Sequence, residues 1–151
     1  MIRGLDPYDT FTVQQTHGIL RRKEHFIERS SDKLGWRSLY CSIQREQPYR
    51  GSFAAIDDHL IVVHRDGPVT ITRRIGDSEI RKTVAPGGLF ILPAGHCFAV
   101  ELGGYLSSIH IYVRGQVVAD AAREVLKGGD REIEIVPRFG VHDPLIEHAA
   151  Y

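Results

Sequence analysis

The sequence predicts a mainly β protein, a small barrel or jelly roll with α-helices near its C-terminal end. From Trp36 to Val113, short segments of alternating apolar and polar residues are separated by Gly- and Pro-containing turns about every 8–12 residues. From Val117 onward, apolar residues recur at i, i+4 and i+8, the pattern of an amphipathic helix. We therefore expect an N-terminal segment or arm at 1–33, a barrel at 34–114, and C-terminal helices with an edge strand at 115–151.

The expected barrel strands follow from the period-two alternation. In residues 36–43, Leu39, Cys41 and Ile43 alternate with polar residues, which is typical of a half-buried strand. The other strands are expected at 59–64, 69–74, 79–84, 89–92, 96–102 and 105–113.

The C-terminal part changes to a helical period. A helix is expected at 117–126, ended by Gly128 and Gly129, and its apolar stripe would pack on the barrel or form a dimer seam. An edge strand is expected at 131–136. Asp143 and Pro144 have the N-cap and first-position preferences of a second helix. Because the sequence stops at Tyr151, about two turns into that helix, we expect the natural chain to continue.

Composition limits the function classes. The 151 residues fit one domain, and 19 Lys and Arg balance 19 Asp and Glu, so the basic excess of a nucleic-acid-binding module is missing. The apolar stretches 60–63 and 89–92 are far too short to span a membrane. Two cysteines are too few for a disulfide framework, so we expect a cytoplasmic protein.

A motif of the form G-x5-P-x-G lies at Gly87, Pro93 and Gly95. It resembles the second conserved motif of the cupin superfamily, whose fold is a double-stranded β-helix or jelly-roll barrel. In that motif a metal-binding histidine follows the last glycine by three residues, a position that falls here on Phe98.

The first cupin motif, started at Gly51, places its metal ligands on Asp57, His59 and either Val63 or His64. Only His59 matches a ligand of the motif exactly, Asp57 offers an alternative oxygen ligand, and the glutamate and the histidine of the second motif are missing. A catalytic metal needs about three protein ligands. The resemblance thus implies a cupin barrel without metal or other cofactor.

A narrower resemblance covers roughly residues 30–151. The stretches 59–68, 86–95, 109–112 and 137–146 resemble the sensor domain of AraC-family transcription regulators. This resemblance implies a non-enzymatic domain that binds a small-molecule effector and forms a homodimer. It would contact DNA only through a helix-turn-helix domain after residue 151. The alternative is a stand-alone metal-dependent cupin enzyme, an isomerase or a dioxygenase-like protein.

Strand alternation predicts which side chains would line an effector pocket. In the cupin register the inner side chains are Asp57, His59, Ile61 and Val63, then His96, Phe98 and Val100, then Ser108, His110 and Tyr112. A slip of one residue would exchange His59 for His64. For His110 and Tyr112 a purely structural role in the core is the alternative. The candidate ligand-binding residues are therefore His59, Ile61, Val63, His64, Phe98, His110 and Tyr112.

Overall fold

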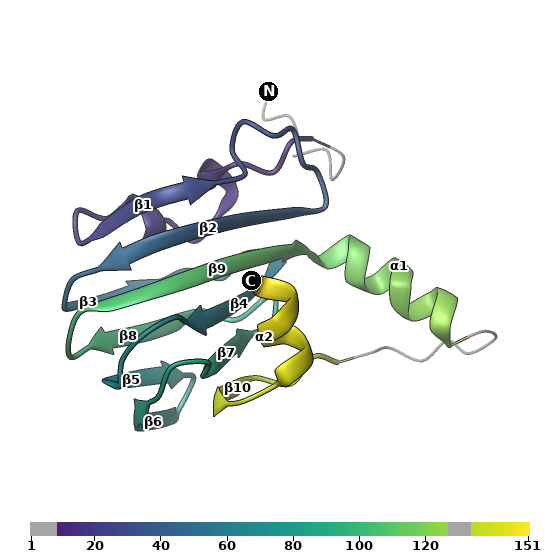
Figure 1. Ribbon diagram of the computed structural model, residues 1–151. Helices are drawn as coiled ribbons and strands as arrows, with labels where there is room; N and C mark the ends of the chain where they lie inside the picture. Colours follow the sequence, from purple (N-terminus) through teal and green to yellow (C-terminus); the bar gives the residue numbers. More distant parts are fainter. Residues whose placement is uncertain (1–8, 127–133) are drawn as a thin grey trace.

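The computed structural model describes residues 9–126 and 134–151. These residues form two facing antiparallel sheets (Figure 1), one with strand order β1-β2-β9-β4-β7-β10 and one with order β3-β8-β5-β6. The predicted mainly β jelly-roll class is confirmed. The strands are β1 (His25–Ser30), β2 (Leu39–Glu46), β3 (Tyr49–Phe53), β4 (Asp58–His64), β5 (Val69–Ile75), β6 (Ser78–Val84), β7 (Leu89–Leu92), β8 (Phe98–Leu102), β9 (Leu106–Arg114) and β10 (Arg138–Val141).

The strands expected from alternation correspond to β2 and to β4 through β9, while β1 and β3 were missed. Strand β1 lies inside the predicted N-terminal arm and pairs with β2, so the sheet begins before residue 34. Its sequence lacks a clear apolar face because β1 is an edge strand with mostly polar, partly exposed residues.

The N-terminal segment also contributes two short 3₁₀ helices, η1 (Val13–Gln15) and η2 (Ile19–Arg21). Phe11, Ile19 and Leu20 from this segment are buried among the residues of the barrel interior. The predicted arm therefore covers the barrel and is part of its core.

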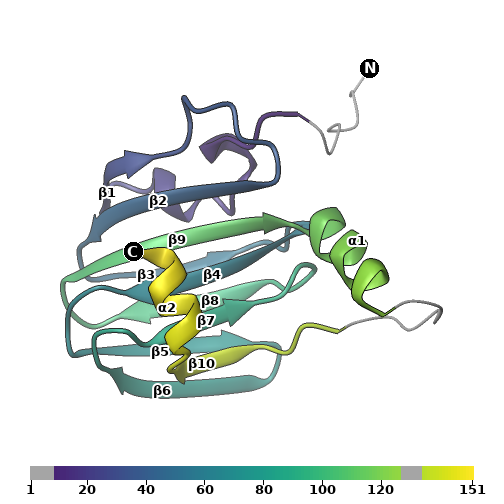
Figure 2. The same cartoon turned by 45° about the vertical axis from the view of Figure 1, so that its right-hand side comes forward.

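Helix α1 (Gly115–Val125) follows β9 directly and points away from the barrel (Figure 2). None of its residues is buried, and Val125 is 79% exposed. The predicted packing of this stripe on the barrel is therefore not found within the described chain. The predicted end of the helix at Gly128 and Gly129 lies outside the described residues.

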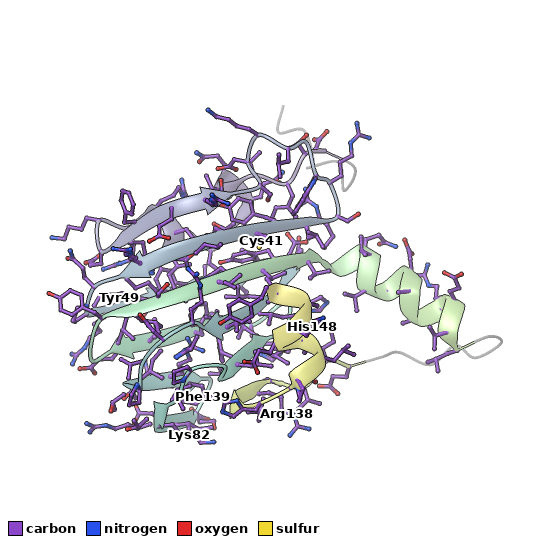
Figure 3. The ribbon with its side chains drawn as sticks, in the orientation of Figure 1. Cys41, Tyr49, Lys82, Arg138, Phe139 and His148 are labelled. Carbon is purple, nitrogen blue, oxygen red and sulfur yellow. The ribbon has the colours of Figure 1, made fainter. Side chains whose placement is uncertain are left out.

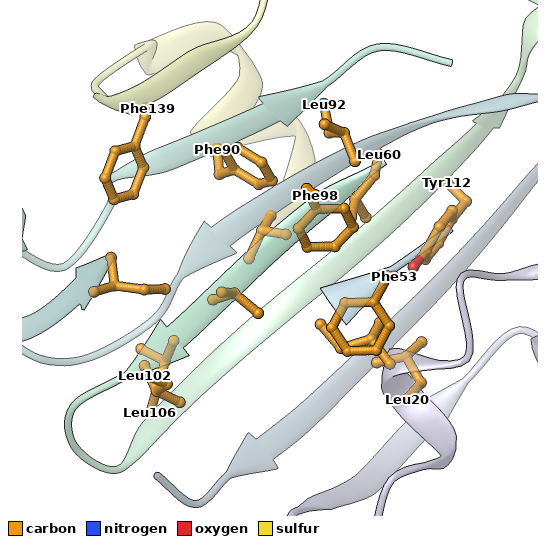
Figure 4. Packing of buried hydrophobic residues seen from close by; sticks show 14 of the residues in the cluster. Leu20, Phe53, Leu60, Phe90, Leu92, Phe98, Leu102, Leu106, Tyr112 and Phe139 are labelled. Atoms are coloured by element: carbon orange, nitrogen blue, oxygen red, sulfur yellow. The ribbon is translucent and has the colours of Figure 1, made fainter. Parts of the chain in front are cut away.

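The C-terminal edge strand lies at β10 and not at the predicted 131–136. Residues 134–136 form no strand, and residues 131–133 lie outside the described part of the chain. Pairing at 138–141 is preferred because Phe139 lies opposite Phe90 of β7, and its ring enters the core (Figure 4).

Helix α2 (Pro144–Ala150) begins as predicted, with Asp143 as its N-cap. The Asp143 carboxylate accepts from the backbone N–H groups of Leu145 (3.0 Å) and Ile146 (3.2 Å). The helix lies on the outer face of the larger sheet, against a cluster formed around Val63, Leu89 and Ile109. Of the helices in the described residues, none is long and apolar enough to cross a membrane.

Candidate functional site

Polar side chains occupy the inner face of the larger sheet where β2 and β9 pair. The register places Ser42 opposite His110 and Gln44 opposite Ser108, and all four side chains are buried. Ser42 Oγ donates to Gln44 Oε1 (2.8 Å), and Gln44 Nε2 donates to Ser108 Oγ (3.0 Å). The cluster thus satisfies within the barrel much of the hydrogen bonding that burial would otherwise leave unmade.

Glu46 is the carboxylate of this cluster. One of its oxygens lies 2.6 Å from His25 Nε2, and the other accepts a 2.6 Å hydrogen bond from Ser108 Oγ. Burial by itself raises the pKa of Glu46, but the bonds from His25 and Ser108 and the neighbouring His110 lower that pKa to about 2. Glu46 is therefore ionised at neutral pH, and both its oxygens are occupied.

Two buried histidines are held in the neutral form. Burial lowers the pKa of His110 to about 3 and that of His64 to about 4. His110 Nδ1 contacts the side-chain amide of Gln44, and as a neutral ring nitrogen it accepts that hydrogen bond. Neither ring nitrogen of His64 has a hydrogen-bond partner among the described residues, although the side chain is fully buried.

Arg73 is a buried cation in the centre of the barrel. It lies on β5, and its guanidinium carbon is 3.6 Å from the centre of the Phe90 ring and 5.2 Å from that of Phe139. Burial lowers the pKa of Arg73 to about 10, so the side chain stays charged at neutral pH. Its Nε and Nη1 atoms have no hydrogen-bond partner in the part of the chain that the structure describes.

Polar and apolar side chains together line one small cavity in the centre of the barrel. Figure 4 shows apolar residues of this lining, among them Leu60, Phe90 and Phe98. The cavity has a volume of about 10 Å³, and its polar lining consists of Glu46 and His110 from the larger sheet and Arg73 and Tyr49 from the smaller sheet. That is room for about one water molecule. The apolar lining includes Ile19, Leu60, Val62, Ile71, Phe90, Phe98, Val100, Leu102 and Leu106.

Towards the other end of the barrel the interior becomes aromatic. The Tyr112 hydroxyl lies 3.1 Å from Nδ1 of His17, and the His17 ring packs edge-on against Phe98. Burial raises the pKa of Tyr112 above its ordinary value and lowers the pKa of His17 to about 4. The N-terminal segment, which carries His17, therefore closes this end of the barrel through direct contact with β8 and β9.

Four of the predicted pocket residues lie inside the barrel. Phe98, His110 and Tyr112 are on the inner face as expected, and His64 is also there, as the slipped register allows. Whether any of them contacts a ligand stays a prediction.

The predicted inner positions of Ile61 and Val63 are wrong. Leu60 and Val62 face the interior, while Ile61 and Val63 pack in the outer cluster beneath α2. His59 lies on the same outer face of β4 as Ile61 and Val63. Its Nδ1 accepts a hydrogen bond from the backbone N–H of Ala94 (2.9 Å) at the edge of the barrel. The error arises because β4 is covered on both faces, which removes the alternation that would fix its register.

Sequence reasoning also missed Glu46, Arg73, His25 and Gln44. One signal was present, since Arg73 continues the alternation of Val69 and Ile71, so a charged residue stands on the buried face of its strand. Gln44 and Glu46 gave no such signal, because polar residues alternating with Cys41 and Ile43 suggest a solvent face.

The metal ligands of the cupin motifs are not brought together. His59 is on the outer side of β4, and Phe98 has no donor atom, although it fills the inner position of the motif histidine. Within residues 9–126 and 134–151, no group of three or more His, Cys, Asp or Glu side chains is arranged to hold a metal ion. The residues of the two motifs therefore do not fit a metal site of the cupin type.

No model of a protein family matches the sequence, and no curated protein matches it either. Among solved structures, the chain is similar to the Cnp3 cupin domain of Schizosaccharomyces pombe, with a TM-score of 0.51 and 10% identity over 67% of this chain and 72% of that one. It is also similar to the EutQ protein of Clostridium difficile, with a TM-score of 0.48 and 15% identity over 60% and 68% of the two chains.

A third similar structure is vicilin from hazelnut, Corylus avellana, with a TM-score of 0.46 and 19% identity over 72% of this chain. The match spans 34% of the vicilin chain, about a third of its length. At these identities the likeness concerns the fold alone. The antiparallel sheet order and the likeness to the Cnp3 domain together show that the chain has a cupin fold.

Proposed function

We propose that this chain is the effector-sensing and dimerisation domain of an AraC-type transcription regulator. In this proposal it binds a small molecule inside the barrel, uses no metal and catalyses no reaction. The cupin fold and the resemblance of stretches 59–68, 86–95, 109–112 and 137–146 to AraC-type sensor domains support it. DNA contact would belong to a helix-turn-helix domain outside these 151 residues.

The observation that carries the proposal is the mixed lining of the barrel interior. Ligand sites combine an apolar wall with a few polar groups held at fixed positions. Here Glu46, Ser108 and His110 are linked by hydrogen bonds, and Glu46 and His110 line the central cavity together with apolar residues such as Val62 and Val100. A purely structural core would not need such a cluster, since apolar residues of similar volume stabilise a fold at least as well.

Arg114 offers a route from the barrel to the rest of the chain. It is the last residue of β9 and the N-cap residue of α1. Its guanidinium donates to the Asp9 carbonyl oxygen and to Gln15 Oε1, both at 3.0 Å, and lies 3.9 Å from the centre of the Phe11 ring. A ligand that shifts the N-terminal segment would therefore also shift the start of α1. If the ligand binds one arrangement of these segments more tightly than another, it increases the population of that arrangement.

Helix α1 is the segment that we assign to dimerisation. Its apolar stripe includes Val117, Val125 and Leu126, which are exposed in the single chain. A stripe of this kind on a projecting helix matches the seam between two copies, with the same face used by both.

Ligand binding is tested by thermal unfolding of the 151-residue chain with sugars, amino acids, neutral aromatics and organic acids. We expect at least one compound to raise the melting temperature progressively with its concentration, by an amount equivalent to about 2.7 kcal/mol at 100 times its Kd. Hydrogen exchange should slow or speed up at residues 11–20 and 115–125 on binding.

Two neighbouring substitutions provide the control. Val100→Phe places a larger side chain into the cavity and should remove the response, whereas Ala99→Phe adds the same ring on the other face of β8 and should not. A panel without any stabilising compound, or equal responses in both variants, would refute binding inside the barrel. Stoichiometric iron, manganese or zinc in the purified protein would favour the metal-dependent enzyme instead.

A further inference from the structure

The buried positive charge of Arg73 defines the chemistry of the barrel interior. Arg73 is only 8% exposed, and no carboxylate oxygen lies within ion-pair distance of it among the described residues. The interior carboxylate, Glu46, already gives one oxygen to His25 and the other to Ser108. A buried cation without a bonded anion is costly, and natural proteins seldom keep one.

The remaining contacts of Arg73 show where an anion would lie. One face of the guanidinium is covered by the Phe90 ring, while Nε and Nη1, both buried, have no partner in the described chain. The side chain lines the central cavity together with Tyr49, Val62 and Phe98. An anion bound to Arg73 would therefore lie mainly among apolar and aromatic groups, with His110 and the Glu46 carboxylate, whose two oxygens are already hydrogen-bonded, in the same lining.

We infer that the small molecule taken by this barrel is a carboxylic acid, that Arg73 binds its carboxylate, and that an apolar body lies against the Phe90 and Phe98 side of the cavity. This inference rests on the proposed function and specifies its ligand class. A single guanidinium matches a monoanion, and its planar donors suit a carboxylate. His64, which is buried and neutral with two unpartnered ring nitrogens, provides a further donor in the same interior.

The cavity is so small that a lining side chain must move before a ligand can enter. With room for about one water molecule, the cavity accepts an organic acid only if a lining side chain yields. Ile19 is the lining residue contributed by the N-terminal segment, and it belongs to the short helix η2 outside the two sheets. Entry of the acid body would thus displace Ile19. In this inference Arg73 selects the charge of the ligand, and the N-terminal segment responds to the size of the ligand.

The experiment compares acids with their own amides. Acetate, butyrate and benzoate are titrated against the 151-residue chain at constant chloride, beside acetamide, butyramide and benzamide, with sodium nitrate as an inorganic monoanion. We expect at least one acid to raise the melting temperature progressively with its concentration, and its amide and nitrate to leave the melting temperature unchanged.

The variants use two adjacent arginines of β5. Arg73→Met should weaken binding of the acid by about 10- to 100-fold, the range of charge-assisted hydrogen bonds. Arg74→Met removes the outward-facing arginine next to it and should bind as the natural sequence does. Without ligand, Arg73→Met should melt at a higher temperature, because it removes an unpaired buried charge. Should Arg73→Met not fold, Arg73→Lys keeps the charge without the planar fork and should weaken binding to a smaller degree.

The outcomes separate this inference from the proposed function. An acid that binds Arg73→Met as well as the natural sequence, or an amide or nitrate that matches its acid, would overturn the assignment of a carboxylate to Arg73. A neutral sugar that stabilises the natural sequence and Arg73→Met equally would leave the sensing function standing but overturn the acid. Absence of binding by every class would overturn both.

Discussion

The two faces of the larger sheet are built from the same strands but differ in chemistry. On β9, Ile109 and Ile111 face outward into an apolar cluster closed by α2, whereas Ser108 and His110 face inward into the hydrogen-bonded cluster around Glu46. Figure 3 shows His148 on α2 and Cys41 on β2, which mark the outer side. The outer face contributes stability through apolar burial, while the inner face fixes polar groups in positions that packing alone does not require.

The largest effect is expected from breaking the inner face at its carboxylate. Glu46→Ala leaves His25 and Ser108 without their partner and removes the carboxylate that lines the same cavity as Arg73, so we expect the free energy of unfolding to fall by about 3–5 kcal/mol. Urea denaturation measures it. Glu28→Ala, which breaks the more exposed ion pair with Arg45 between the same strands β1 and β2, should cost below about 1 kcal/mol. Equal losses of unfolding free energy in the two variants would contradict a larger stabilising role for the inner cluster around Glu46.

Breaking the outer face should cost stability without affecting ligand response. Ile109 is 1% exposed between the sheet and α2, so Ile109→Ala should lower the free energy of unfolding by about 3 kcal/mol through lost burial and a residual cavity. The response to a ligand found for the natural sequence should keep its Kd within about twofold. A large change in Kd would show that the two faces are not independent.

The buried histidines on the inner face of the larger sheet should make the stability of the protein depend on pH. His110 and His64 have folded pKa values of about 3 and about 4, below the ordinary 6.5, so below pH 6.5 the unfolded chain binds more protons and stability falls. Each histidine should contribute about 1.4 kcal/mol per pH unit between about pH 6 and pH 4.5. In urea denaturation across this pH range, His110→Gln should make the slope shallower by that amount.

Glu46 acts in a lower pH window. Its folded pKa of about 2 lies below the ordinary 4.5, so its stabilising contribution is complete above pH 4.5 and is lost as the pH falls towards 2. Denaturation of Glu46→Ala across pH 2–7 should therefore lack the acid part of the profile. An unchanged profile in that variant would contradict an ionised Glu46.

The smallest effect is expected at the helix that covers the outer face. Asp143 satisfies two backbone N–H groups at the start of α2, so Asp143→Ala should cost about 1 kcal/mol. Asp143→Asn, which keeps an acceptor oxygen, should cost less. Thermal unfolding of the two variants checks the difference, and equal losses would mean that the cap bond does not hold α2 to the sheet.

The inner residues of β8 and β9 could be predicted from the sequence because polar and apolar residues alternate along these strands. On β8 and β9 one face is more polar or more exposed than the other, and Phe98, His110 and Tyr112 were placed on the inner face correctly. On β4 the run from Leu60 to Val63 is apolar at every position, since both faces are covered, and the register was displaced by one residue.

The sequence by itself determined the mainly β class, the positions of most strands, the start of α2 and the resemblance to cupin motifs, because these depend on local alternation, turns and caps. Only the tertiary structure decided that Arg73 and Glu46 lie together inside the barrel and that Ile61 and Val63 lie outside it. Alternation says that two faces of a strand differ, but which face is enclosed depends on what the distant strands, the N-terminal segment and α2 cover.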